Sequence, residues 1–243
     1  MVLKYRATKE NSYNFMTQNI LALDTALNGC NVAVLKGGSG GACFTDVRAM
    51  TRGQSEVLVP MVQGVLEQAG LAFSDLHMIV TTIGPGAFTG LRIGLSTARS
   101  FAAALDIPVI GLTTLEVLAA QYEGGGPLAL ILETKREDFY VQVFGKDREP
   151  LSEASVMAGA DLTEVLKEFS GVALGGDGAA RFIAQEKADY KVVAGLDVPD
   201  PAVMARLGLG GFEAGETREA VPLYLRGADV SVRKTPLRVL ASS

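Results

Sequence analysis

The chain has 243 residues, and its 48% hydrophobic and 20% charged residues are typical of a folded protein with a sizeable core. A formal net charge of −5 means that the whole molecule repels phosphate backbones, so autonomous nucleic-acid binding is not expected. No apolar run approaches the roughly 20 residues that cross a bilayer, so we expect no membrane-spanning segment.

Histidine and cysteine are scarce, which limits the possible chemistry. His77 is the single histidine, so a metal site with two imidazoles or a Ser-His-Asp triad would have to use this one residue. We therefore expect no catalytic residue, no metal and no cofactor. Cys30 and Cys43 are too few for a disulfide scaffold and are interpreted as thiols, or simply as small buried residues, of a cytoplasmic protein.

The chain begins with residues 1–17, which show no periodicity and are expected to lie outside the fold. A first lobe over residues 18–122 is predicted from strand-like and helix-like runs in the order βββαβαβα. The expected strands are Ile20–Leu23, Asn31–Lys36, Ala42–Val47, Met78–Ile83 and Val109–Gly111, and the expected helices are Ser55–Ala69, Gly90–Leu105 and Thr113–Gln121.

A glycine-rich stretch, Glu123–Pro127, ends the apolar signal and predicts a domain boundary. A second lobe over residues 123–243, including a C-terminal tail, repeats the order of strands followed by alternating helices and strands. Its expected elements are Leu128–Leu132, Phe139–Phe144, Asp161–Phe169, Val172–Leu174 and Ala180–Lys187. Two such α/β lobes, each a mixed sheet with flanking helices, suggest a duplicated actin-like architecture.

The densest motif is TIGPGAFTGLRIG, from Thr82 to Gly94. It predicts a strand, a glycine-rich turn and a helix with Thr89 as its N-cap. The helix N-terminus could hold an anion, but the motif matches neither the P-loop nor the dinucleotide fingerprint. A structural turn and a phosphate site both remain open at this point.

Five segments together closely resemble the TsaB (YeaZ-like) family of the glycoprotease-like branch of the actin-like superfamily. They are ILALDTA at Ile20–Ala26, SEVLVPMV at Ser55–Val62, GPGAFTGLRIG, GLTTLEVLA at Gly111–Ala119 and PLYLR at Pro222–Arg226. The resemblance implies an accessory subunit of bacterial tRNA threonylcarbamoyladenosine synthesis. Such a subunit would work with a TsaD-like catalytic paralogue and a TsaE-like ATPase, meet tRNA only through their complex, and possibly form a homodimer.

In that setting the paralogue transfers threonylcarbamoyl to N6 of adenosine 37 in tRNAs reading codons that begin with A. The alternative is a free-standing actin-fold ATP-dependent phosphotransferase, with Asp24 and Glu133 as its carboxylates. The weak candidates for a nucleotide site are Asp24 and Thr25 in the first phosphate loop and Gly175 and Gly176 in the adenosine-side turn. Ala26 stands where that first loop needs a glycine, which argues against the phosphotransferase.

Two helices carry more apolar lines than one small lobe can easily bury. One line of the first helix and a small-residue stripe of the second are expected to form the surface for the TsaD-like partner. These residues are Val57, Met61 and Val65, together with Gly90, Gly94 and Ala98. The alternative is that small residues let the two helices cross closely inside the lobe.

Overall fold

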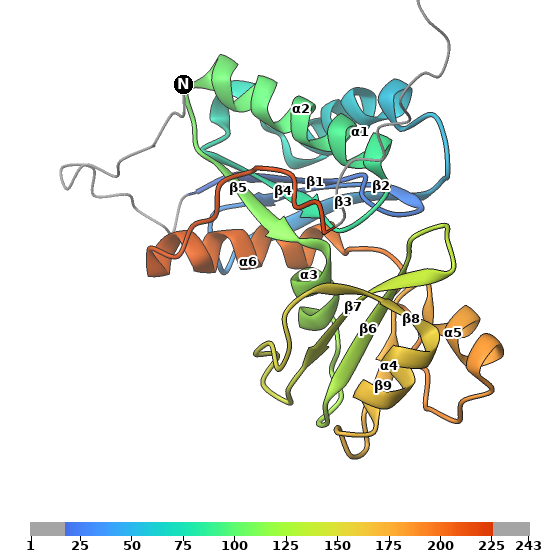
Figure 1. Ribbon diagram of the computed structural model, residues 1–243. Coiled ribbons are helices and arrows are strands. Elements are labelled where there is room, and N and C mark those ends of the chain that lie inside the picture. Colours follow the sequence, from blue (N-terminus) through green and yellow to red (C-terminus); the bar gives the residue numbers. More distant parts are fainter. Residues whose placement is uncertain (1–17, 226–243) are drawn as a thin grey trace, which may run out of the picture.

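Two mixed β-sheets, one in each lobe, form the framework of the protein (Figure 1). The computed structural model describes residues 18–225, so the expected extension 1–17 lies outside the described residues. The first lobe runs β1 (Ile20–Asp24), β2 (Gly29–Lys36), β3 (Ala42–Ala49), α1 (Gln54–Ala69), β4 (Met78–Gly84), α2 (Phe88–Leu105), β5 (Val109–Thr113) and α3 (Thr114–Ala120). The second runs β6 (Leu128–Glu133), β7 (Asp138–Phe144), β8 (Ser155–Ala158), α4 (Gly159–Leu166), β9 (Ala173–Gly175) and α5 (Ala179–Glu186), and α6 (Pro201–Ala214) follows.

The first sheet has the strand order β3-β2-β1-β4-β5. The pairs β1–β2 and β2–β3 are antiparallel, whereas β4 lies parallel to both β1 and β5. Every residue of β1 is buried, because helices cover both faces of the sheet. This explains why ILAL is a continuous apolar run rather than an alternating one.

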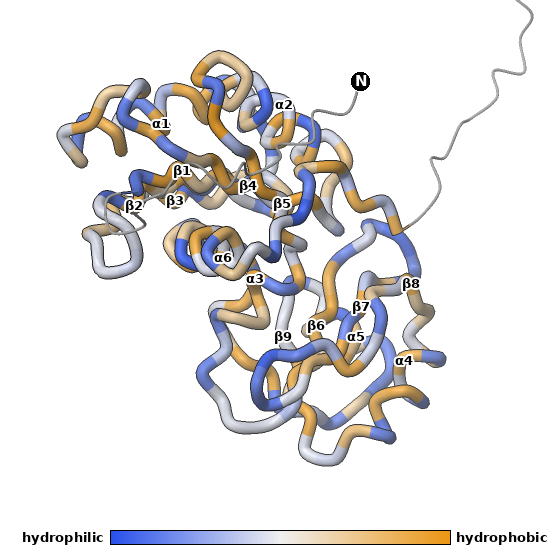
Figure 2. The backbone as a smooth tube through the Cα atoms, turned by 90° about the vertical axis from the view of Figure 1, so that its left-hand side faces the viewer, coloured by the Kyte–Doolittle hydropathy of each residue, from blue (hydrophilic) through white to orange (hydrophobic). Residues whose placement is uncertain are grey.

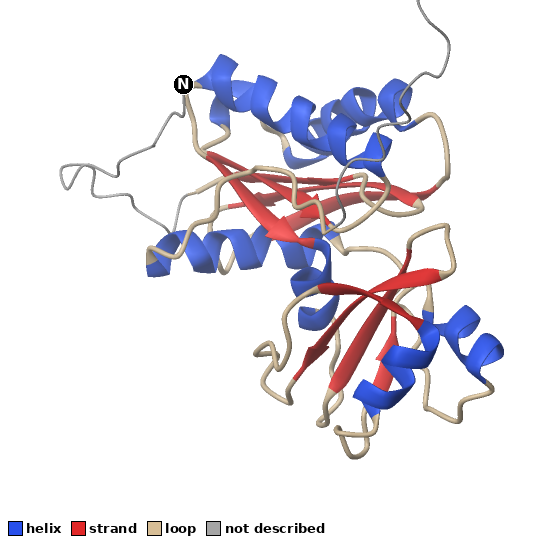
Figure 3. Cartoon of the chain, viewed as in Figure 1, coloured by secondary structure: helices blue, strands red, loops and turns tan. Residues whose placement is uncertain are grey.

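Helices α1 and α2 cover one face of the first sheet and α6 covers the other (Figure 3). Leu21 and Leu23 of β1 point into the core shared with α1 and α2. Their neighbours Ile20 and Ala22 point into the core shared with α6, where they meet Met204. The alternation of side chains along β1 therefore connects two separate cores.

The placement of residues 201–214 in the second lobe was wrong, because α6 completes the core of the first lobe. The helix was missed in the sequence because three glycines interrupt its apolar pattern. Gly208 is buried against Val80 of β4, where an added Cβ would lie 2.3 Å from a methyl group. Close packing on the sheet, rather than helix propensity, fixes this element. Thr89 is also not the N-cap of α2; the helix begins at Phe88, with Ala87 as N-cap.

The second sheet has the order β8-β7-β6-β9 and two different cores on its faces. On one side Ile131 and Val141 pack against α4 and α5. On the other, Leu128 and Leu130 pack against Leu115 and Leu118 of α3. Figure 2 shows apolar colouring along β4 and β6, which are interior strands of the two sheets. Since α3 also contacts β5 and α6, it joins the two lobes through a continuous apolar contact.

Candidate functional site

Asp24, at the end of β1, is fully buried and is surrounded by donors from its own chain. Its Oδ1 accepts hydrogen bonds from the Thr82 hydroxyl at 2.6 Å and from the Ala26 backbone N–H at 3.0 Å. Its Oδ2 accepts one from Asn31 Nδ2 at 3.0 Å. Burial raises the pKa of the Asp24 carboxyl above its ordinary value, and these three hydrogen bonds oppose that rise. The carboxyl group therefore holds together the end of β1, β2 and β4.

The loop after Asp24 is pressed against the start of α2. The Thr25 hydroxyl donates to the Gly90 carbonyl oxygen at 2.6 Å, and Ala87 N–H donates to the Ala26 carbonyl oxygen at 2.7 Å. A Cβ on Gly90 would lie 2.0 Å from the Thr25 carbonyl oxygen. The glycines of the TIGPGAFTGLRIG motif thus serve close packing at the position where a phosphate loop would need open space.

In the second lobe, Gly175 and Gly176 also serve packing. Gly176 has a φ of 97°, and a Cβ there would lie 2.3 Å from the Ile131 carbonyl oxygen of β6. A Cβ on Gly175 would lie 2.6 Å from a methyl group of Leu196. Only glycine allows this turn to approach β6 so closely.

A charged cluster lies at the end of β6, beside this turn. Arg181 Nε lies 2.7 Å from Glu133 Oε1, and its Nη2 donates to the Asp138 carbonyl oxygen at 3.1 Å. Asp177 Oδ1 accepts from the Glu133 N–H at 2.9 Å. Burial raises the pKa of Asp177, and the charges of Glu133 and Asp197 raise it further, against the effect of that hydrogen bond. The Glu133 carboxylate is thus engaged by Arg181.

The four weak candidates for a nucleotide site therefore have structural roles in the fold. Asp24 and Thr25 are buried and hydrogen-bonded within the first lobe, and Gly175 and Gly176 are packed in the second. The two pairs belong to different sheets, and each is held by contacts within its own lobe. A carboxylate with three internal donors is poorly placed to act as a base or to hold Mg²⁺, because a ligand would have to displace those donors.

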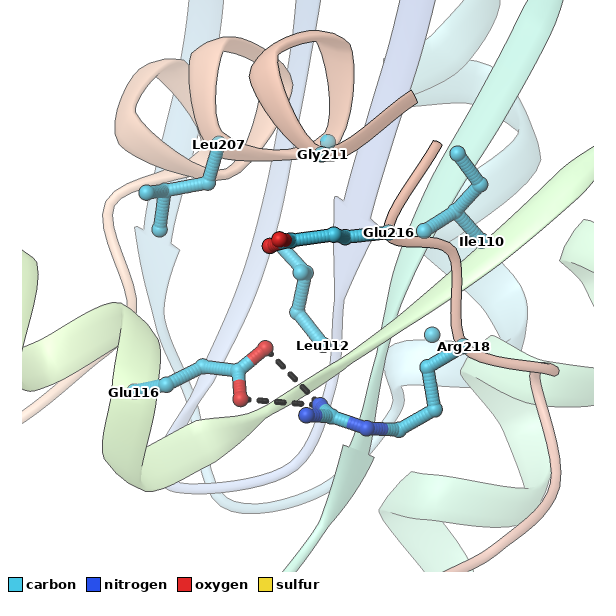
Figure 4. Close-up of a pocket in the computed structure, with 9 residues that line it drawn as sticks. Ile110, Leu112, Glu116, Leu207, Gly211, Glu216 and Arg218 are labelled. Atoms are coloured by element: carbon cyan, nitrogen blue, oxygen red, sulfur yellow. Dashed lines mark hydrogen bonds and ion pairs between the residues drawn. The ribbon is translucent and has the colours of Figure 1, made fainter. Parts of the chain in front are cut away.

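Two hollows are candidate sites, and neither carries a concentrated set of reactive groups. A cavity of about 50 Å³ lies between α6, β5 and the segment after α6, beside the ion pair of Arg218 Nη1 and Glu116 Oε2 at 2.8 Å (Figure 4). A wider groove of about 460 Å³ lies between residues 121–124 and 191–196, where the chain passes twice between the lobes. Within residues 18–225 no group of three His, Cys, Asp or Glu side chains could hold a metal ion.

His77 has a structural position. The imidazole Nδ1 accepts a hydrogen bond from the Asn19 backbone N–H at 3.0 Å, and the His77 backbone N–H donates to the Asn19 carbonyl oxygen at 2.9 Å. These two bonds fix the entry of β4 beside β1. In the described part of the chain, no helix is long and apolar enough to cross a membrane.

The expected partner surface needs correction. Met61, Val65, Gly90, Gly94 and Ala98 are buried within the first lobe, and Val57 is partly buried against the same core. Met61 and Val65 belong to the core formed with the sheet. Gly90 and Gly94 of α2 admit the loop at Thr25, whose Oγ1 would lie 2.7 Å from a Cβ on Gly94. The two apolar lines of α1 and α2 are thus mostly buried inside the lobe, because the sheet and the 24–26 loop cover them.

The outer surface of α1 and α2 is formed by other residues. Val59, 38% exposed, and Pro60 project from α1, while Arg92, Ser96 and Arg99 project from α2. Figure 1 shows the two helices side by side on the face of the sheet that is away from the second lobe. Sequence periodicity located both helices, but the residues that it selected lie on their inner faces.

Sequence reasoning also missed a cluster of Phe88, Arg92 and Tyr224. The two aromatic rings are about half exposed and lie 5.6 Å apart, although 136 positions separate them in the chain. The only available signal was that both residues belong to segments of the family resemblance, GPGAFTGLRIG and PLYLR.

Comparison with known proteins adds sequence relatives to this picture. The family model described as "TsaD: tRNA N6-adenosine threonylcarbamoyltransferase" matches residues 48–198. The tRNA threonylcarbamoyladenosine biosynthesis protein TsaB of Bacillus subtilis (strain 168) is 30% identical over 232 residues, which cover 88% of this chain and 96% of that protein. The TsaB of Escherichia coli (strain K12) is 37% identical over 100 residues, 41% of this chain and 42% of the relative.

A solved structure has the same fold. YeaZ from Pseudomonas aeruginosa matches with a TM-score of 0.75 and 24% sequence identity, over 86% of this chain and all of that one. The expected two-lobed α/β actin-like fold is confirmed.

Proposed function

The chain belongs to the TsaB family of tRNA threonylcarbamoyladenosine biosynthesis proteins, and from this we propose that it is a non-catalytic subunit that binds and positions a TsaD-like paralogue. The paralogue would transfer threonylcarbamoyl to N6 of adenosine 37 in tRNAs reading codons that begin with A. A TsaE-like ATPase would complete the complex in the cytoplasm, and tRNA would be recruited through the complex. Without its partner, the chain could associate with a second copy of itself.

One observation supports the non-catalytic role: the loop after β1, where an actin-like enzyme binds phosphate, is packed against the start of α2. Gly90 of α2 packs against the Thr25 carbonyl oxygen. The Asp24 carboxylate already accepts hydrogen bonds from Thr82, Asn31 and Ala26. A phosphotransferase of this fold needs a carboxylate and backbone amides that face an open cleft. The free-standing phosphotransferase is therefore the weaker alternative.

The outer surface of α1 and α2 supports a binding role, and we place the partner contact there. Val59 and Pro60 are exposed, and Val57 and Ile93 are partly buried against the core of the same lobe. Apolar side chains on exposed helix faces are typical anchors of protein interfaces. Of the residues expected from the sequence, only Val57 stays a candidate for this contact.

Reconstitution tests the proposal. Purified TsaD-like paralogue, TsaE-like ATPase, threonylcarbamoyl-adenylate and tRNA are combined with or without this chain, and modified adenosine is measured by mass spectrometry of digested tRNA. We expect modification only when both the chain and the paralogue are present. Modification by the chain without the paralogue, or full activity without the chain, would contradict the proposal.

A second measurement addresses the phosphotransferase. The chain alone is titrated with ATP and Mg²⁺ by calorimetry, and phosphate release is followed. We expect neither saturable binding at micromolar ATP nor release above the buffer control. Magnesium-dependent binding that is lost in Glu133→Gln would revive the alternative.

A further inference from the structure

Strand β3 lies at the end of the first sheet and has one free edge. It pairs with β2 along its whole length, and within residues 18–225 no strand pairs with its other side. Helices α1 and α6 lie mainly over β2 and β1, so none of the eight residues of β3 is buried. The outward N–H and C=O groups of such an edge can bond to a further strand.

The hydrogen bonds of the β2–β3 ladder show which backbone groups face this free edge. The Met50 N–H donates to the Asn28 carbonyl oxygen at 3.2 Å, so these two residues continue the ladder as a hydrogen-bonded pair. Hydrogen-bonded and non-hydrogen-bonded pairs alternate along an antiparallel ladder. The even-numbered residues of β3 therefore bond to β2. The residues whose backbone groups point away from β2 are Cys43, Thr45, Val47 and Ala49.

Two side chains of opposite charge lie two residues apart on β3. Asp46 and Arg48 share the face of the strand that carries Phe44, because side chains alternate between the faces. The Arg48 Nη2 donates to Asp46 Oδ2 at 2.7 Å, and its Nε donates to Oδ1 at 3.1 Å. Val47 lies between them on the other face and is 54% exposed. The free edge thus presents the pattern acid, valine, base.

We propose that the free edge of β3 pairs with the same edge of a second copy of this chain, antiparallel and about a twofold axis at Val47. The Val47 N–H and C=O groups would bond to those of Val47 of the second copy. Asp46 would lie opposite Arg48 of the second copy, and Arg48 opposite its Asp46. A twofold pairing uses the same surface of both copies, so the pair of opposite charges occurs twice.

The charges select this register among the possible ones. Outward-facing residues must pair with outward-facing residues, so the twofold axis has to pass through a residue and not between two residues. An axis at position 46 or 48 would place two aspartates or two arginines opposite each other, and an axis at Thr45 would place Asp46 opposite Phe44. The axis at Val47 pairs each charge with its opposite and brings Phe44 opposite Met50, another partly buried apolar residue.

Charged residues on an edge strand commonly prevent pairing, because charges of one sign repel a second strand. Here Asp46 and Arg48 have opposite signs, and the pattern acid, valine, base is its own complement when the strand is reversed. This self-complementarity favours a second copy over an extended segment of another protein. The edge also lies apart from the outer surface of α1 and α2, so this inference does not depend on the proposed function.

Analytical ultracentrifugation of the full chain over a range of concentrations tests the proposal. We expect a weak dimer with a Kd of about 1 to 100 μM, because a single strand pair buries less surface than a stable dimer does. Asp46→Arg and Arg48→Asp each place like charges opposite one another in the dimer, and each should raise the Kd at least about tenfold. Circular dichroism confirms that both variants are folded.

A mixture of these two variants provides the decisive measurement. In a mixed dimer the two aspartates of Arg48→Asp face the two arginines of Asp46→Arg, so the wild-type Kd should return. The bond between positions 46 and 48 within one strand stays broken in both chains, so only a contact between chains explains the recovery. Val59→Glu, on the outer surface of α1, is the control and should leave the Kd unchanged.

A wild-type chain that stays monomeric at the highest concentration would overturn the proposal. Single variants that associate like the wild type, or a mixture without recovery, would overturn it as well. Loss of co-purification with the TsaD-like paralogue in Asp46→Arg would show that the paralogue occupies this edge instead of a second copy. Since the expected pairing is weak, its loss should not lower the melting temperature of the dilute chain.

Discussion

The Thr82 hydroxyl donates a 2.6 Å hydrogen bond to the Asp24 carboxylate inside the first lobe, where neither residue has appreciable solvent exposure. This bond joins β1 to β4 across the position where an actin-like enzyme would receive a phosphate. The acidic group at the end of β1 therefore acts as a structural crosslink between strands.

Asp24 should make stability depend on pH. Burial raises its folded-state pKa above the ordinary 3.8, so the folded state binds the proton more tightly than the unfolded state does. Stability from this group is fully present below the unfolded pKa and is lost as pH rises through the folded pKa. Urea denaturation between pH 4 and 8 should show this loss in the wild-type chain and a reduced loss in Asp24→Asn.

Asp24→Ala tests the same crosslink differently. It leaves the Thr82 hydroxyl, the Asn31 amide and the Ala26 N–H without their acceptor, which costs about 2 to 4 kcal/mol. Asn31 Oδ1 is buried and has no hydrogen-bond partner within residues 18–225, so a side-chain amide at position 24 could donate to it. We therefore expect Asp24→Asn to be milder than Asp24→Ala at neutral pH, and the reverse order would contradict this account.

Gly90 should tolerate no side chain. Gly90→Ala places a Cβ 2.0 Å from the Thr25 carbonyl oxygen, so α2 would have to move, and we expect a loss of more than about 2 kcal/mol in unfolding free energy. Gly64→Ala is the matched change in α1, where a Cβ meets no other described residue within 4 Å. It should stabilise the chain by up to about 1 kcal/mol, as measured by thermal unfolding.

The partner surface can be separated from the core by three substitutions to glutamate. Val59→Glu, on the outer surface of α1, should abolish co-purification with the TsaD-like paralogue while the melting temperature stays within a few degrees, because an unpaired charge opposes association when it is desolvated. Met61→Glu should unfold the lobe, since Met61 is 1% exposed. Val47→Glu on β3 should alter neither the co-purification nor the melting temperature. Wild-type complex formation by Val59→Glu would refute a partner contact on the outer surface of α1.

Arg148 should hold the passage between the lobes. Its Nε donates to the Tyr122 carbonyl oxygen at 3.0 Å, its Nη1 to that of Gly145 at 3.1 Å, and its Nη2 to that of Gly124. Arg148→Ala removes these bonds, and cleavage after Glu123 by a glutamate-specific protease should accelerate severalfold, as followed by mass spectrometry. The control is Arg206→Ala, which changes an exposed arginine of α6 and should leave the cleavage rate unchanged. Equal cleavage rates for both variants would show that the Arg148 hydrogen bonds do not hold this segment.

The sequence by itself determined the local elements and their order. Apolar runs and helical spacing located β1 to β7, β9 and α1 to α5 within a few residues, because these signals depend on neighbours along the chain. The short strand β8 and the glycine-interrupted α6 lacked such a local signal. The motif around Gly90 also indicated the family through its resemblance, and the structure shows that its glycines allow a close approach to the loop at Thr25.

Only the tertiary structure decided which apolar surfaces meet. Periodicity shows that Met61 and Ala98 lie on apolar faces, but not that the sheet and its neighbouring helix cover them. The return of α6 to Val80, the donors around Asp24 and the stacking of Phe88 on Tyr224 all join residues that are far apart in sequence. Such contacts are set by packing of the whole chain, which a pattern of a few neighbouring residues does not encode.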